Sequence, residues 1–223
     1  MLYINEVRDI FQLKVRLLGI SPMIWRRVLV PAAMMLRELH SVFQLAMGWE
    51  SIHFYAFDIR AVQYGAFELS MSDPCMPLSY FEFRANDKFT YTYDMGDGWL
   101  HEVRVETIIS ADPQKIYPVC TGGSGACPPE ECGGPRGFLT HRDEANGYDA
   151  WQDMHAMLGL LSEATKPDAG DDVVRSFLDD NVRMTMDRVL SRQAYLATKF
   201  SRKEINQAFR DNRHRDLMRQ QLW

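Results

Sequence analysis

Hydrophobic and polar positions alternate with a period of two over residues 11–18, a pattern typical of a half-buried β-strand. A second predicted strand, residues 24–30, follows a turn at Ser21 and Pro22. The third, residues 53–59, is rich in aromatic side chains. The first part of the chain therefore predicts strands of a sheet.

The strongest alternation spans residues 89–106 and predicts a β-hairpin. Its turn, Met95–Gly98, holds two glycines and an aspartate between the two alternating runs. The period places His101 on the same face as Trp99 and two valines. Because a polar ring on an apolar face needs a hydrogen-bonding partner, we expect His101 to have one.

Helical spacing is found between and after these strands. Hydrophobic residues recur every three or four positions over residues 36–47, and Gly48 stands where a helix would end. Residues 148–161 have a helical pattern as well. Ser201 and Glu204 form a capping box that predicts the start of a final helix of about 20 residues.

Together these elements predict an α+β protein with a mainly antiparallel sheet, one helix packed on it and a helical C-terminal extension. We place the α+β domain at residues 1–163 and the basic helical extension at residues 164–223. Within the first domain, residues 118–137 are expected to be a long constrained loop, because Gly, Pro and Cys make up 13 of these 20 residues. Loops of this length usually carry function or are held by another part of the structure.

The composition is that of an ordinary globular protein, with 46% hydrophobic and 25% charged residues among 223. No apolar run approaches the roughly 18 residues needed to cross a bilayer, and the first residues lack the features of a signal peptide. We therefore expect a cytoplasmic protein that does not contact a membrane. In that compartment its four cysteines would stay reduced.

Charge is divided unevenly along the chain, with a net charge of +6 on residues 182–223 and −11 on residues 1–181. On the final helix, four basic side chains fall within an arc of about 100°: Arg202, Lys203, Arg210 and Arg213. This arrangement predicts contact with nucleic acid phosphates or with a protein partner. The alternative is a solvated helix face, or one docked on the acidic body of the same chain or of a second subunit in a homo-oligomer.

Cys120, Cys127 and Cys132 lie in the Gly- and Pro-rich loop at intervals of seven and five residues. Three thiolates on a rigid loop, with His101 of the hairpin as a fourth ligand, could hold a structural zinc ion. The spacing is not that of a CxxC knuckle. The alternative is therefore a packed loop held by prolines, tight turns and backbone hydrogen bonds.

A second candidate cluster combines carboxylates of the hairpin turn and the loop with an imidazole. Its members are Asp94, Asp97, His101, Glu130 and Glu131. Such groups hold a divalent ion and activate water in hydrolases and nucleases, and the catalytic set predicted here is Asp94, Asp97, His101 and Glu130. The alternative is that the aspartates only cap their own turn.

Four segments also carry a resemblance to a known family. They are, in chain order, LKVRLLGISPMIWRRVLVP, LRELHSVFQLAMGW with the following His53 and Phe54, YTYDMGDGWLHEVRVE, and YPVCTGGSGACPPEECGGPRGF. Over about residues 10–160 the chain resembles the Ri-plasmid third-open-reading-frame family, which comprises plasmid-borne and insertion-element passenger proteins, sometimes labelled resolvase-like. The resemblance implies a compact α+β domain in a bacterial protein linked to mobile elements. Where relatives usually have an acidic pair ending in Asp, this chain has Glu130 and Glu131.

The sequence lacks a complete catalytic signature, which favours a non-enzymatic binding or regulatory module. Such a module would engage nucleic acid or a protein partner through the basic C-terminal helices, beside a surface shaped by the hairpin and the cysteine loop. Two alternatives stay open: a metal-dependent hydrolase or nuclease, and a zinc-stabilised interaction module.

Overall fold

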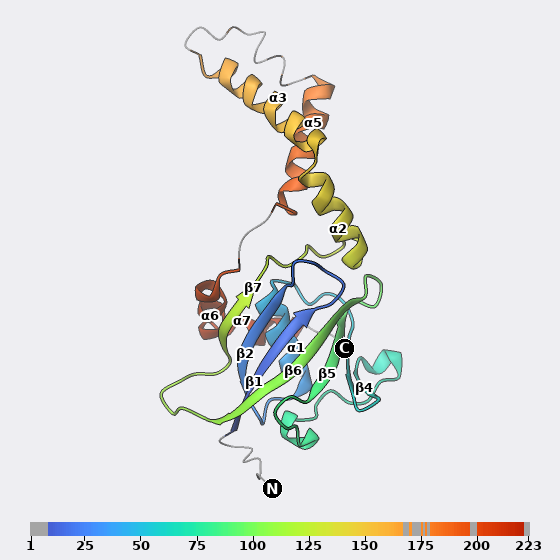
Figure 1. The fold of residues 1–223 in the computed structure, drawn as a ribbon, viewed down its shortest axis with the longest axis vertical. Helices are drawn as coiled ribbons and strands as arrows, with labels where there is room; N and C mark the ends of the chain where they lie inside the picture. The colour runs from blue at the N-terminus through green and yellow to red at the C-terminus, as the bar shows by residue number, and fades with distance from the viewer. Residues whose placement is uncertain are drawn as a thin grey trace. The chain divides into compact units, whose positions relative to one another are not determined.

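The predicted strands, together with residues 62–65 and 119–124, pair into one seven-stranded sheet with the order β4-β3-β5-β6-β1-β2-β7. All of its strand pairs are antiparallel, and Figure 1 shows the strands side by side. The strands are β1 (Asp9–Leu17), β2 (Trp25–Pro31), β3 (Tyr55–Ile59), β4 (Val62–Gly65), β5 (Lys88–Tyr93), β6 (Trp99–Ser110) and β7 (Val119–Ser124). The predicted α+β class with a mainly antiparallel sheet is confirmed.

This computed structural model describes residues 9–166, 170, 175, 177, 179–196 and 200–220. The chain forms two compact units. The first, here called the sheet unit, comprises Met1–Pro135 together with Lys199–Trp223, and the second, the helical unit, comprises Arg136–Thr198. The predicted boundary at residue 163 thus lies inside the helical unit.

The core of the sheet unit lies between the sheet and helix α1 (Leu36–Met47). Alternate residues of β1 point into it, and Phe11, Leu13 and Val15 are fully buried. The end of α1 follows the prediction, because Gly48 adopts a left-handed conformation with φ of 94° and its N–H bonds to the Gln44 carbonyl. Two short 3-10 helices, Phe67–Leu69 and Leu78–Phe81, complete the segment between β4 and β5.

A buried polar network lies within this aromatic core. His40 of α1 stacks on Tyr55, with ring centroids 3.8 Å apart. Its Nδ1 is 2.7 Å from the Tyr91 hydroxyl and its Nε2 is 2.8 Å from the Ser51 hydroxyl. Burial holds the pKa of His40 well below its usual value, so the ring is neutral. A neutral imidazole with both nitrogens hydrogen-bonded can be buried at little cost.

The prediction that residues 118–137 form a loop throughout is wrong at both ends. Residues 119–124 form the edge strand β7, which pairs with β2, and helix α2 (Gly134–Ala145) begins before the predicted loop ends. Gly123 of β7 leaves room for a distant side chain, because a Cβ at this position would lie 2.6 Å from the ring of Phe200. A tertiary contact with a distant residue therefore requires the glycine that locally argues against a strand.

The predicted final helix is two helices, α6 (Arg202–Arg210) and α7 (Arg213–Gln220). Between them Asn212 adopts a left-handed conformation with φ of 59°, which ends the first helix. Helix α6 packs on β7 and α7 packs on α1. Asn206 fixes α6 to the strand, since its side chain accepts the Cys120 N–H and donates to the Cys120 carbonyl, each at 2.8 Å.

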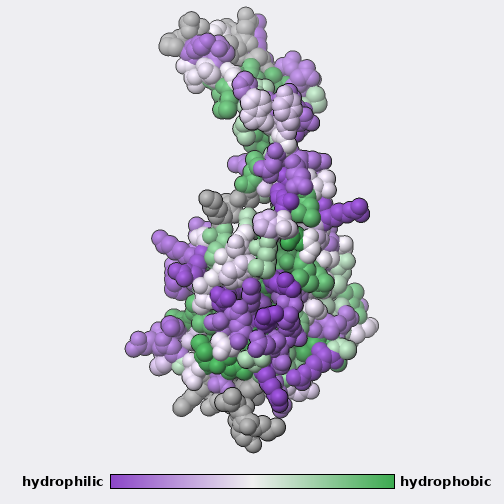
Figure 2. Space-filling model, in the orientation of Figure 1, coloured by the Kyte–Doolittle hydropathy of each residue, from purple (hydrophilic) through white to green (hydrophobic). Residues whose placement is uncertain are grey.

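The helical unit contains most of α2 together with α3 (Tyr148–Ala164) and α5 (Asp180–Gln193). Helices α3 and α5 pack on each other, and Asp153 of α3 forms ion pairs with Arg188 and Arg192 of α5. No residue in the described part of α3 or α5 is fully buried. Figure 2 shows hydrophobic residues among hydrophilic ones on the surface of this unit. Among the described residues, no helix is long and apolar enough to cross a membrane.

Candidate functional site

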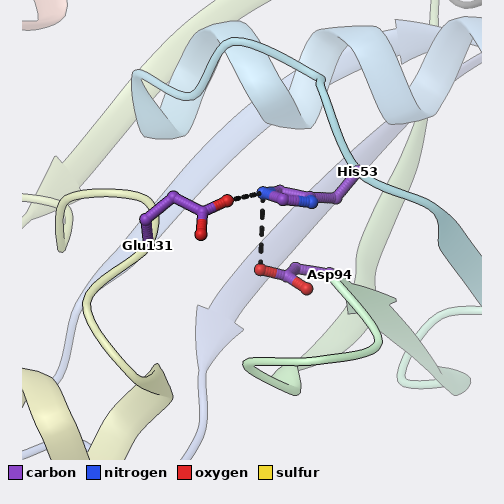
Figure 3. A group of neighbouring side chains, drawn as sticks. All are labelled: His53, Asp94 and Glu131. Atoms are coloured by element: carbon purple, nitrogen blue, oxygen red, sulfur yellow. Dashed lines mark ion pairs between the residues drawn. The ribbon is translucent and has the colours of Figure 1, made fainter.

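Three side chains from three separate loops meet at one end of the sheet (Figure 3): His53, Asp94 and Glu131. The Nε2 atom of His53 lies 2.7 Å from Oε1 of Glu131 and 3.6 Å from Oδ2 of Asp94. Within the part of the chain that the structure describes, this is the one group of three or more His, Cys, Asp or Glu side chains with ligand atoms close enough to share a metal ion. We call it the His53 cluster.

A tight turn between β5 and β6 positions Asp94. Its Oδ1 accepts the N–H groups of Gly96 and Asp97 at 2.9 and 3.2 Å, while its own N–H donates to the Phe54 carbonyl at 2.9 Å. The aspartate thus caps its own turn, as the alternative interpretation of the sequence expected. Both of these bonds use Oδ1, so the other carboxylate oxygen, Oδ2, is left to face His53.

The segment between β7 and α2 brings Glu131 to the same place. Trp49, just after α1, donates its ring N–H to the Pro128 carbonyl at 2.9 Å. At the other end of the segment, a Cβ on Gly134 would lie 2.2 Å from the Asp97 carbonyl oxygen, and φ of Gly134 is +67°. Only glycine permits this close approach of the segment to the turn that carries Asp94.

Glu130 supports the cluster from its edge. One of its carboxylate oxygens accepts the Tyr93 hydroxyl, and the other accepts the Glu50 N–H at 2.8 Å. Burial and the adjacent Glu130 carboxylate raise the pKa of Tyr93, which keeps its hydroxyl protonated and able to donate. The Tyr93 hydroxyl also accepts the Ile52 N–H at 3.2 Å, so it tethers the residue that precedes His53.

The donor set of the His53 cluster suits a divalent transition-metal ion. An imidazole nitrogen with two carboxylate oxygens is a ligand set that zinc, manganese and iron accept. The Nε2 atom of His53 is shielded from solvent yet makes no hydrogen bond of normal geometry to any described residue. Ligand atoms about 2.1 Å from a tetrahedral ion lie about 3.4 Å apart, which the His53–Asp94 pair already matches. The Glu131 carboxylate lies closer than this to His53, but 70% of its side chain is exposed, so it has room to move outward to the same spacing.

The chain was compared with protein families and with known proteins. A family model described as "Plasmid pRiA4b ORF-3-like protein" matches residues 9–168, which is more than half of the chain. The chain belongs to the plasmid pRiA4b ORF-3-like family. This confirms the resemblance that the four sequence segments carry.

Two relatives of this family member are described in terms that assign no activity. The chain is 36% identical over 138 residues to the uncharacterized protein y4hQ of Sinorhizobium fredii (strain NBRC 101917 / NGR234), covering 59% of this chain and 71% of the relative. It is also similar to a crystal structure of a protein of unknown function, MM3350 from Methanosarcina mazei Go1, with a TM-score of 0.58 and 30% identity. That match covers 68% of this chain and 89% of the solved chain.

The predicted catalytic set is brought together only in part. Asp94 lies in the His53 cluster, whereas the Glu130 carboxylate accepts the Tyr93 hydroxyl. Asp97 contributes only its backbone N–H, which donates to Asp94 in the turn. His101 is fully buried on the sheet, where its Nδ1 lies 3.1 Å from the Tyr91 carbonyl, which is the partner that the alternation required. Burial lowers the pKa of His101 to about 4, and the ring is neutral.

The predicted zinc ligands do not converge within the described part of the chain. No group of three or more ligand atoms there includes Cys120, Cys127, Cys132 or His101. Burial raises the pKa of all three thiols, to about 11 for Cys132, so they are protonated at neutral pH. The Cys120 thiol instead donates to the Gly122 carbonyl at 3.5 Å, as a small buried residue does.

The predicted basic surface lies on α6 and α7. The side chains of Arg202, Lys203, Arg210 and Arg213 are all exposed. Arg213 also lines a groove of about 610 Å³ between α1 and the two C-terminal helices, together with acidic residues such as Glu204 and Asp216. The groove is therefore of mixed charge, and contact of these helices with nucleic acid or a protein stays a prediction.

Sequence reasoning missed His53 as a site residue, although it noted the residue within a family segment. Its position in the chain was a signal that could have pointed to it. His53 lies between the end of one helix and the start of an aromatic strand, and such a connection runs along the end of a sheet. Glu131 was placed in the candidate cluster but not in the catalytic set. Which of two adjacent glutamates faces His53 depends on the left-handed backbone of Glu131, with φ of 59°, which no local pattern predicts.

Proposed function

We propose that the sheet unit binds a divalent transition-metal ion through His53, Asp94 and Glu131, and that the ion serves a hydrolytic reaction. The observation that carries this proposal is the convergence of three ligand atoms within 4.8 Å of one another from three loops. Each loop is held by its own contacts, at Tyr93, at the Asp94 turn and at Trp49. The sheet unit thus preorganises the donors, as a metal site requires.

The open side of the cluster favours a reactive ion over a structural one. Structural zinc sites are closed by four protein ligands, whereas catalytic sites have three and leave a position for water or substrate. The His53 cluster offers three, and its outer ligand, Glu131, is 70% exposed. An ion with an open position acts as a Lewis acid in the hydrolysis of esters and phosphodiesters. The groove that Trp49, Glu50 and Ile52 line borders the segment leading to His53 and offers room for a substrate.

The test uses metal-free protein and titration calorimetry with Zn²⁺ and with Mn²⁺. We expect one ion per chain for the wild type. Asp94→Asn should weaken binding by roughly a hundredfold or more, because it removes an anionic ligand. The asparagine oxygen can still accept the Gly96 N–H and tolerates the left-handed φ of 56°, so the turn should persist.

The matched control is Asp112→Asn, because Asp112 caps a different turn by accepting the Gln114 N–H. This variant should bind metal as the wild type does. Cys127→Ser and Cys132→Ser should also bind normally. If the serine variants lose the ion while Asp94→Asn keeps it, the metal lies on the thiols and the proposal is wrong. If neither the wild type nor any variant binds either ion, the proposal is wrong, and the contacts of His53 with Asp94 and Glu131 only hold the loops together.

Hydrolysis is tested separately from binding. A model phosphodiester such as bis(p-nitrophenyl) phosphate should be cleaved by the metal-loaded wild type and not by Asp94→Asn. Binding without any turnover of phosphodiester or ester substrates would leave a metal-binding module and contradict the hydrolytic part of the proposal.

A further inference from the structure

Four basic side chains form a row across one face of the sheet. The strand register places Arg104 of β6 opposite both Lys88 of β5 and Lys14 of β1, and it places Lys14 opposite Arg27 of β2. Residues directly opposite each other in a sheet share one face. These four residues, here called the cationic row, therefore cross four neighbouring strands. With strands about 4.8 Å apart, the row is roughly 14 Å long.

The cationic row lies on the face of the sheet that points away from α1. Alternate residues of a strand point to opposite faces, and Val15 and Val103, next to row residues, are fully buried in the core. In Figure 1 α1 lies behind the sheet, and Figure 2 shows hydrophilic side chains over the strands in the same view. The side chains of Lys88 and Arg27 are 43% and 33% exposed, so a partner can reach the row.

Two glutamates beside the row neutralise part of its charge. Glu106 accepts from the Arg27 guanidinium with both of its carboxylate oxygens. Glu102 accepts from Arg16, a further cation of this face, with one oxygen and from Lys88 with the other, each at 3.0 Å. Both carboxylates are thus engaged. The row and Arg16 together carry five positive charges, so a surplus of three stays after both glutamates are counted.

Lys14 and Arg104 face each other across β1 and β6, and neither has an ion pair with any described residue. Glu106 lies near Lys14, whose charge contributes to the lowered pKa of that glutamate. Asp58 shares this face but lies on β3, the strand beyond β5. Like charges directly opposite each other destabilise a sheet. An anion bound over the pair would turn this repulsion into attraction, which points to binding rather than to stability.

An aromatic ring adjoins the cationic row. Trp25 of β2 is half-buried on the same face, with Nζ of Lys14 4.8 Å and the guanidinium carbon of Arg27 5.2 Å from its ring centroid. Gly122 of β7 makes room for the ring, because a Cβ there would lie 3.5 Å from it. A base stacked on an aromatic ring gains more than a surface cation–π contact does. A base can therefore replace either cation on Trp25 and free it for a phosphate.

We propose that the cationic row and Trp25 bind single-stranded nucleic acid, with phosphates on the row and a base on the ring. A single small anion would not span the row, whereas a strand carries one phosphate per nucleotide. A duplex offers phosphates but keeps its bases stacked on one another, so the ring favours a single strand. An anionic membrane offers charge but no base. This surface is separate from the predicted one on α6 and α7, and the inference does not depend on the His53 cluster.

The experiment is fluorescence anisotropy of a labelled single-stranded DNA of about 12 nucleotides, titrated with the full chain at about 50 and about 200 mM KCl. We expect binding that weakens steeply with salt. The double variant Lys14→Gln, Arg104→Gln should bind roughly tenfold or more weakly and have a salt slope smaller by about 1.4, because two phosphate contacts are lost. It breaks no ion pair of the described residues and removes a repulsion, so it should unfold at no lower temperature than the wild type.

The matched control is the double variant Lys203→Gln, Arg210→Gln, which removes the same charge from exposed positions of α6. It should bind within about threefold of the wild type, because salt screens exposed charges that are far from the ligand. Trp25→Leu tests the ring. It should weaken binding by roughly tenfold with an unchanged salt slope, because stacking releases no counterions.

Three results overturn the inference. The first is a wild type that does not bind the single strand at about 50 mM salt, including one that binds only phosphatidylserine vesicles. The second is a loss of binding in the α6 control but not in the variant of Lys14 and Arg104. The third is a duplex bound as tightly as the single strand. Metal titration of the Lys14 and Arg104 variant should match the wild type, which separates this test from that of the His53 cluster.

Discussion

The sheet unit and the helical unit differ in how far they bury their large apolar side chains. In the sheet unit, Trp99, Tyr91, Phe43 and Phe57 are fully buried, and polar groups such as His40 are buried only with partners. In the helical unit, the described parts of α3 and α5 have no fully buried residue, and large apolar side chains such as Trp151 are exposed.

The difference follows from the number of neighbours that each element has. A strand within the sheet, such as β1 between β6 and β2, is paired on both edges, and α1 covers the same sheet through Phe43, whose ring contacts Phe57 and Tyr91. Helices α3 and α5, by contrast, pack mainly against each other. The sheet unit can therefore hold the side chains of a site in fixed positions.

The largest effect expected of a single substitution at neutral pH comes from truncation in the core of the sheet unit. Phe57→Ala should lower the free energy of unfolding by about 3–5 kcal/mol, because it removes a fully buried ring and leaves a cavity. The same kind of change in the helical unit, Leu160→Ala, should cost about 1 kcal/mol or less, because Leu160 is half-buried. Urea unfolding followed by circular dichroism measures both. Equal losses would contradict the contrast between the two units.

The next effect is a loss of stability in acid that is specific to the sheet unit. The pKa of His101 is lowered from about 6.5 to about 4 by burial, and that of His40 is lowered in the same way. Below pH 6.5 the unfolded chain binds protons that the folded chain does not. The free energy of unfolding should therefore fall by roughly 1.4 kcal/mol per pH unit for each histidine as the pH drops toward 4.

His101→Gln separates this cause from others, since it removes one titrating ring and should reduce the slope between pH 6.5 and 4 by roughly 1.4 kcal/mol per pH unit. In the helical unit, two arginines lower the pKa of Asp153 to about 2, so this pair titrates below that range. An unchanged slope in His101→Gln would assign the acid sensitivity to other groups.

The smallest of the three effects tests whether α6 belongs to the sheet unit. Asn206→Ala removes two hydrogen bonds to the backbone of Cys120 on β7 and should cost about 1–2 kcal/mol. Hydrogen exchange should then speed up in α6 and β7 together. Lys203→Ala, at an exposed position of the same helix, is the control and should change stability by less than about 0.5 kcal/mol.

The candidate site shows where local patterns stop being informative. The alternation over residues 89–106 locates the turn, and the structure places Asp94 there. It cannot show that the segment carrying Glu131 lies beside that turn, because this depends on the approach of Gly134 to the Asp97 carbonyl. Glu131 and His53 are 78 residues apart, and only the packed chain brings them together.

The sequence by itself determined strands β1, β2, β3, β5 and β6, helix α1 with its end at Gly48, and the family, because each depends on residues that are close together in the chain. The tertiary structure decided that the glycine-rich residues 119–124 form the edge strand β7, that the final helix breaks at Asn212, and that His53 rather than His101 joins the carboxylates. The physical reason is that these outcomes depend on contacts between distant segments. Periodicity in the sequence reports which face of an element is buried, but not what covers it.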